Sequence, residues 1–222
     1  MLLSSVVMAR FFALFETHEL NPGGRVFMPD VVEKLVKQCR FVKYPQKAED
    51  YGGEKGTIFE TGTFNGQSIE KIMIFAGGIV LDTLENTDTS EKTLAQLLEW
   101  AASECGITYR PEMLKRRVYV SSLVITSEVP LLEINPVLRH ISTVVTKEMG
   151  ICLGRPLVYE PSGFAVGYDK ETTSFTPAVF SLDRRQGKPF SDNKYYSNAP
   201  LRTSVHMRLL EDIEKAAASS VR

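Results

Sequence analysis

The chain is poor in the residues that hold metal ions or close disulfide bonds. It has three cysteines and three histidines, all scattered, and no Cys-x-x-Cys pair. Structural zinc sites need such ligands clustered at short spacings, and small secreted domains carry paired cysteines. No Asn-x-Ser/Thr glycosylation signal occurs either. The sequence therefore predicts no metal or other cofactor, a reducing, cytoplasmic location, and cysteines that act as small core side chains.

An excess of charge of either sign is also absent, because 26 basic residues balance 27 acidic ones. This excludes a basic field over the whole chain that would steer it onto nucleic acid, although a local basic patch stays open. The apolar residues 1–15 are too few for a membrane span, which needs roughly 20, and Arg10 interrupts them. We expect no membrane span and predict a strand at 9–20. Met8 is an alternative start, which would make residues 1–7 an N-terminal extension.

The composition that remains is typical of a globular protein, with 43% hydrophobic and 24% charged residues in a chain of 222. A chain of this length can bury a core without disulfides or metals. Strand and helix patterns are mixed along it, without the regular alternation of a doubly wound parallel sheet. The sequence predicts one α+β domain over residues 1–222, with a mainly antiparallel sheet and about four amphipathic helices.

A β-meander is predicted around residues 57–85. Asn65-Gly66 favours a two-residue hairpin turn, because a type I′ turn needs positive φ at both central positions. Gly77-Gly78 offers a second reversal, which would set Phe75 opposite Val80. The first turn predicts the cross-strand pairs Phe64–Gln67, Gly62–Ile69, Glu60–Lys71 and Phe59–Ile72. Further strands are predicted at 115–128, 156–160, 163–169 and 178–184.

Capping signals and apolar spacing predict the helices. Asp30 and Asp88 each precede a glutamate by three residues, as in a capping box. Asn135-Pro136 is typical of a helix start, with Gly150 as its stop, and the last helix begins at Thr203 or Ser204. The faces expected to be buried are Val32, Leu35, Val36 and Cys39; Leu94, Leu97, Leu98, Ala101 and Cys105; Leu138, Ile141, Val145 and Met149; and Val205, Leu209, Ile213 and Ala216.

Signals of a catalytic site are few. Residues 52–57 are rich in glycine but lack the Gly-Lys-Ser/Thr ending of a phosphate loop. Asp82 ends an apolar strand near Glu85, where a metal-dependent hydrolase could place an acidic ligand, although no Glu-x-Lys lies on the neighbouring strand. His206 falls in the first turn of the last helix, where a surface histidine is expected. No residue is therefore assigned a catalytic role.

The clearest local departure in composition is the segment 184–208, with six basic residues against one acidic residue. Aromatic residues lie among these charges, in what we expect to be an irregular loop at 185–202. Tyrosine and arginine are enriched at protein interfaces, and basic–aromatic mixtures also bind single-stranded nucleic acid. A long loop that packs its rings onto its own sheet is a third explanation. The candidate partner-binding residues are Arg184, Arg185, Lys188, Phe190, Lys194, Tyr195, Tyr196 and Arg202.

These patterns leave catalysis open and favour a non-catalytic role. The leading hypothesis is a protein-binding or assembly-forming α+β protein that acts as an oligomer or as a component of a larger complex. One alternative is a nucleic-acid-binding protein that uses residues 184–208. The other is a metal-dependent hydrolase with Asp82 as an acidic ligand. The expected partner is another protein, either a second copy of the chain or a different one.

Overall fold

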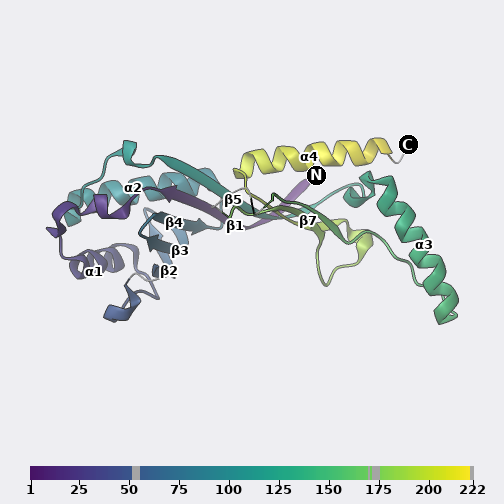
Figure 1. Cartoon of the computed structure of the whole chain (residues 1–222), viewed down its shortest axis with the longest axis horizontal. Coiled ribbons are helices and arrows are strands. Elements are labelled where there is room, and N and C mark those ends of the chain that lie inside the picture. The colour runs from purple at the N-terminus through teal and green to yellow at the C-terminus, as the bar shows by residue number, and fades with distance from the viewer. Residues whose placement is uncertain (52–55, 170, 172–175, 221–222) are drawn as a thin grey trace. The chain divides into compact units, whose positions relative to one another are not determined.

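A computed structural model of the chain describes residues 1–51, 56–169, 171 and 176–220 (Figure 1). Over these residues it contains four α-helices and an eight-stranded antiparallel sheet, so the predicted α+β class is confirmed. The glycine-rich stretch 52–57 lies largely outside the described residues. The strands are β1 (Leu2–Leu14), β2 (Thr57–Phe64), β3 (Gln67–Phe75), β4 (Gly78–Thr83), β5 (Arg116–Thr126), β6 (Gly163–Val166), β7 (Phe180–Arg184) and β8 (Lys194–Ala199). The helices are α1 (Met28–Cys39), α2 (Thr87–Cys105), α3 (Pro136–Leu153) and α4 (Thr203–Ser220).

The chain divides into two compact units. The N-terminal unit comprises Val6–Ser121 and Pro200–Thr203, and the C-terminal unit comprises Met1–Ser5, Ser122–Ala199 and Ser204–Arg222. The strand order is β2-β3-β4-β1-β5-β8-β7-β6, and β1 and β5 contribute residues to both units. Each unit is therefore assembled from distant parts of the chain.

In the N-terminal unit the β2–β3 hairpin has the predicted register, with Phe64 opposite Gln67 and Glu60 opposite Lys71. The predicted pairing of Phe75 with Val80 is wrong, because Phe75 lies opposite Gly78. Gly78 has φ of 153° and pairs with Leu14 of β1, and a Cβ at this position would lie 2.3 Å from the carbonyl oxygen of Ala13. Gly78 is therefore a strand residue, and the reversal uses residues 76–77 instead.

The core of this unit lies between the sheet and the helices α1 and α2. The predicted buried face of α2 is confirmed at Leu94, Leu97, Leu98 and Ala101. Both predicted capping boxes are wrong. The helix α1 starts at Met28, with Pro29 in its first turn and no side-chain cap. Asn86 caps α2, where its Oδ1 accepts a hydrogen bond from the backbone N of Thr89 at 2.8 Å.

The C-terminal unit contains a strand that the sequence did not predict. Residues 194–199 form β8 inside the segment expected to be irregular, with Tyr195, Ser197 and Ala199 buried in alternation. Ser197 shares a hydrogen bond of 2.8 Å with Nε2 of His206, which is fully buried. The expectation of a surface histidine is therefore wrong, and so is the predicted buried face of α4, because Leu210 and Ala217 are buried while Leu209 is exposed.

The helix α3 starts as predicted, with the side chain of Asn135 accepting a hydrogen bond from the backbone N of Val137 at 2.9 Å. It continues past Gly150 to Leu153 and is stopped by Gly154, whose φ of 64° is the left-handed conformation of a helix stop. None of its residues is buried, so the prediction of a buried stripe is wrong. In the parts of the chain that the structure describes, no helix combines the length and the apolar character that crossing a bilayer requires.

Candidate functional site

Arg184, at the end of β7, is held by contacts within the C-terminal unit. Its side chain is 5% exposed, and its guanidinium donates hydrogen bonds to the carbonyl oxygens of Pro161 (3.1 Å) and Phe190 (2.8 Å). A third bond of 2.7 Å reaches the carboxylate of Glu160. The ring of Phe190 lies 4.2 Å from its Cζ. Arg184 therefore fastens the β7–β8 connection to the chain that precedes β6, and its charge is already paired.

An open hollow of about 550 Å³ lies next to Arg184. Arg185 and Lys188 on its wall are exposed, and Phe190 is 40% exposed. Cations and aromatic rings therefore face solvent together, as in surfaces that bind phosphates and stacked bases. Nucleic-acid binding by this segment stays a prediction, and the residues available for it are those that line the hollow: Arg185, Lys188, Phe190 and Tyr196.

The remaining predicted residues lie elsewhere. Tyr195 is fully buried, and its hydroxyl accepts a hydrogen bond from the backbone N of Leu131 at 3.0 Å. Lys194 is half-buried at the start of β8. Arg202 belongs to the N-terminal unit. Four of the eight predicted residues thus line the hollow together with Arg184, whereas Tyr195 is buried and Arg202 belongs to the other unit.

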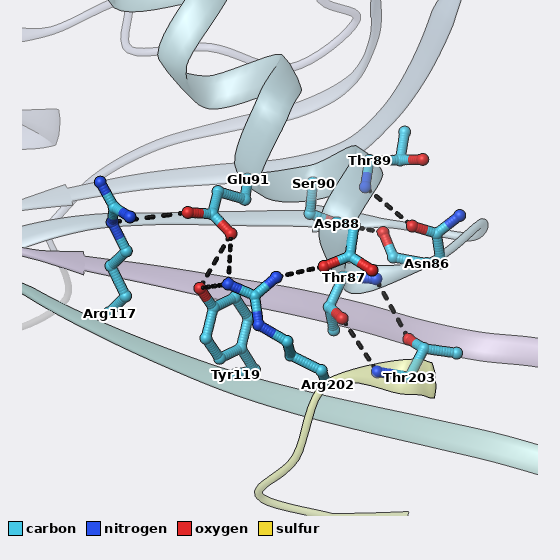
Figure 2. A network of polar contacts seen from close by, with 10 residues as sticks. All are labelled: Asn86, Thr87, Asp88, Thr89, Ser90, Glu91, Arg117, Tyr119, Arg202 and Thr203. Atoms are coloured by element: carbon cyan, nitrogen blue, oxygen red, sulfur yellow. Dashed lines mark hydrogen bonds and ion pairs between the residues drawn. The ribbon is translucent and has the colours of Figure 1, made fainter. Parts of the chain in front are cut away.

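Arg202 is the centre of a polar network on α2 (Figure 2). It donates hydrogen bonds to Asp88 and to the hydroxyl of Tyr119, and a bond of 2.9 Å to Glu91. Its Cζ lies 4.1 Å from the centre of the Tyr119 ring. Glu91 also accepts a bond of 2.8 Å from the Tyr119 hydroxyl and pairs with Arg117 at 3.4 Å. The two acids predicted to cap α2 thus bind a cation from a distant part of the chain.

Two threonines complete this attachment. The backbone N of Thr87 donates to the hydroxyl of Thr203 at 3.1 Å, and the backbone N of Thr203 donates to the hydroxyl of Thr87 at 2.9 Å. Both residues are buried, so each satisfies an amide that the start of a helix would otherwise leave without a partner. The network and this pair together fix residues 200–203 to α2.

Asp82, the candidate acidic ligand, lies on β4 directly opposite Arg10 of β1. Each of its carboxylate oxygens accepts a bond of 2.7 Å from that guanidinium. The Asp82 residue is only 6% exposed. Among the described residues no group of three or more His, Cys, Asp or Glu side chains is arranged to hold a metal ion. The carboxylate of Asp82 is therefore engaged in an ion pair within the sheet.

The helix α3 presents an uncovered apolar surface. At about 100° per residue, its apolar side chains other than Pro136 and Leu153 cover about 160° of the helix, from Ile151 through Ile141 to Met149. Glu148 is the charged residue within this arc. Val137, Ile141 and Ile151 are 63%, 49% and 67% exposed. Figure 1 shows α3 standing apart from the strands of its own unit. We call this surface the α3 apolar face.

The chain covers the opposite side of α3. The hydroxyl of Thr146 accepts a hydrogen bond of 2.8 Å from the backbone N of Tyr159. Residues 158–161 line a shallow hollow with Ser142, Thr143 and Lys147, which lie on the polar side of the helix. The polar side of α3 is therefore partly covered by the chain, and the α3 apolar face is left open to solvent.

Comparison with protein-family models and with curated protein sequences finds no match for this chain. The case for a function rests on the geometry above.

The α3 apolar face was visible in the sequence as an amphipathic pattern, but the pattern does not say whether the same chain covers it. The Arg202 network had no local signal, because its partners lie 111 and 114 positions away. The sequence also did not separate the buried cysteines from the exposed ones. Cys39 is buried as expected, whereas Cys152 on α3 is exposed.

Tyr119 gives a pH test of the Arg202 network. Burial, followed by the hydrogen bond and charge of Glu91, raises the pKa of Tyr119 from 10.0 to about 12. The free energy of unfolding should therefore be unaffected by this group below pH 10 and should fall as the pH rises from 10 towards 12, because the unfolded state loses its proton first. Allowing for solvent screening at a partly exposed site, we expect a loss of about 1 kcal/mol.

The measurement is urea unfolding at a series of alkaline pH values, compared with Tyr119→Phe. The variant should lack this part of the decline, and other tyrosines contribute equally to both proteins. Identical declines in the two proteins would show that Tyr119 ionises as easily in the folded state as in the unfolded state.

Proposed function

We propose that this protein is an assembly-forming protein that associates with a second copy of itself through the α3 apolar face. The observation that carries the proposal is that α3 is 18 residues long, amphipathic and without a single buried residue. An isolated helix of this length is marginally stable in water and in proteins gains most of its stability from packing of its apolar face. A partner on this face would supply that packing.

The size of the face supports a protein partner. A helix of this length is about 27 Å long and about 10 Å wide, so the face covers a few hundred Å². The largest apolar patch on a typical monomer has about this size and is often functional. A second copy is the partner we choose, because a twofold pair presents the same patch from both sides and is the commonest form of soluble oligomer. Two such helices would pack with their axes about 8–10 Å apart.

Size-exclusion chromatography with light scattering tests the proposal. The wild-type protein should have twice the mass of the 24.9 kDa chain. Ile141→Glu places a charge in the middle of the face in both copies, and we expect its dissociation constant to rise at least about 100-fold. Glu148→Leu removes the charge already present and should tighten association. Because Ile141 is exposed, its substitution should leave the thermal stability of the dissociated chain nearly unchanged.

Thr143→Glu is the matched control, since it adds the same charge to the same helix on the polar side. It should leave the mass unchanged. A wild-type protein that stays at 24.9 kDa at every concentration would refute self-association. Equal weakening by the Ile141 and Thr143 variants would show that the face itself is not the contact.

A further inference from the structure

The N-terminal unit contains an apolar cavity of about 110 Å³ between α1, α2 and the strands β3 and β4. Its walls are side chains such as Leu35 of α1, Leu97 of α2 and Ile72 of β3. Apart from the indole N–H of Trp100, the only polar side-chain groups among the residues that line it are those of Thr17 and Asn21. The cavity is independent of α3, which belongs to the other unit.

The two polar side chains are already engaged. The hydroxyl of Thr17 donates to the carbonyl oxygen of Phe75 at 2.8 Å. The side chain of Asn21 donates to the carbonyl of Val26 at 2.8 Å and accepts from its backbone N at 3.0 Å. A buried water needs two to four polar partners, whereas apolar cavities of about 150 Å³ stay dry and bind benzene. The chemistry of the walls therefore selects an apolar occupant.

The walls are held in place and the cavity has an opening. The Lys34 ammonium of α1 donates to the carbonyl of Glu104 at the end of α2 at 2.6 Å, and the backbone N of Thr108 donates to the carbonyl of Leu20 at 2.8 Å. Met28 on the wall is 43% exposed and Trp100 is partly buried. Since a methionine side chain adapts its shape easily, we expect Met28 to move aside when a ligand enters from solvent.

We propose that this cavity is a binding site for a small uncharged hydrocarbon group about the size of one aromatic ring. Such a group fills the space and leaves no polar atom without a partner. A carboxylate of the same ring size is excluded, because the residues that line the cavity offer no cation to balance its buried charge.

Trp100 is the single tryptophan of the chain, so its fluorescence reports on the cavity. Titration of the full-length protein with bromobenzene, whose bromine quenches indole fluorescence, should give saturable quenching. Benzoate at the same concentrations should not compete with bromobenzene and should leave this quenching unchanged. Quenching that rises linearly without saturation, or competition by benzoate, would overturn the proposal.

The matched variants are Ala101→Leu and Ala102→Leu. Ala101 lines the cavity and is 7% exposed, whereas its neighbour Ala102 does not line it. Filling the space should weaken bromobenzene binding by more than about tenfold in the first variant and leave it unchanged in the second. Val31→Phe, which fills the same space from the partly exposed α1 side, serves where Ala101→Leu fails to fold. Equal binding by the filled and control variants would place the ligand elsewhere and end the proposal.

Discussion

Replacing Arg10 with alanine is expected to lower the free energy of unfolding by about 3 kcal/mol. The substitution leaves the carboxylate of Asp82, which is 6% exposed, without the two hydrogen bonds of 2.7 Å that it accepts from Arg10. Breaking a buried pair from one side costs about 3–5 kcal/mol because an uncompensated charge remains. We place the loss at the low end of this range, since the Arg10 side chain is itself 28% exposed.

The measurement is urea unfolding of Arg10→Ala, Asp82→Ala and the double variant. If the loss comes from the unpaired carboxylate, adding Asp82→Ala to Arg10→Ala should recover stability instead of reducing it further. The control is Arg25→Ala, which removes a cation from an exposed position in the same unit. A loss below about 1 kcal/mol for Arg10→Ala would mean that water solvates Asp82 once the guanidinium is gone.

Replacing Arg184 with alanine is expected to cost about 3 kcal/mol in the C-terminal unit. The change leaves the carbonyls of Pro161 and Phe190 and the carboxylate of Glu160 without their donor, and removes the contact with the Phe190 ring. Arg184→Lys should recover only part of the loss, because an ammonium cannot donate in three fixed directions and stack on a ring at the same time.

Arg185→Ala is the matched control for this prediction. The neighbouring arginine is exposed, so the substitution should change stability by less than about 0.5 kcal/mol. Amide hydrogen exchange in β7 and β8 would assign the loss to the C-terminal unit, since exchange there should accelerate for the Arg184 variants and not for the control. Equal effects of the two alanine variants would contradict the structural role of Arg184.

The two turns of the β-meander illustrate what the sequence can specify. Asn65-Gly66 provides one obvious place for a two-residue turn, so the register of β2 and β3 follows from it. Around Gly77-Gly78 a two-residue turn fits at 77–78 or one position earlier, and local sequence does not choose between them. The choice depends on the backbone of Ala13 on β1, which leaves no room for a side chain at residue 78.

The strand β8 was missed for a related reason. Its buried positions include Ser197, whose polarity hides the alternation typical of a strand. Burial of that hydroxyl is tolerated because it shares a hydrogen bond with His206, a residue of the following helix. Considered alone, Ser197 and His206 would each be expected at the surface. The hydrogen bond between them explains why both can be buried.

The candidate sites could not be predicted fully from the sequence for a different reason. The apolar arc of α3 follows from its sequence, whereas its exposure depends on which other segments reach it. Arg202 was predicted as a partner-binding residue from its charge and its neighbours in the chain. It bonds instead to Asp88 and Glu91, which lie on α2, more than 100 positions earlier in the chain. The acids that match it were interpreted as caps because capping is the local explanation.

The attachment of residues 200–203 to α2 has a consequence for the order in which the protein folds during synthesis. The N-terminal unit cannot acquire the Arg202 and Thr203 contacts until more than 200 residues have been translated. At about 5–20 residues per second, α2 therefore leaves the ribosome several seconds before its partners do. During this interval Asp88 and the amide of Thr87 lack their partners, and Glu91 has only Arg117 and Tyr119. Co-translational folding of this unit should therefore finish only after residues 200–203 emerge.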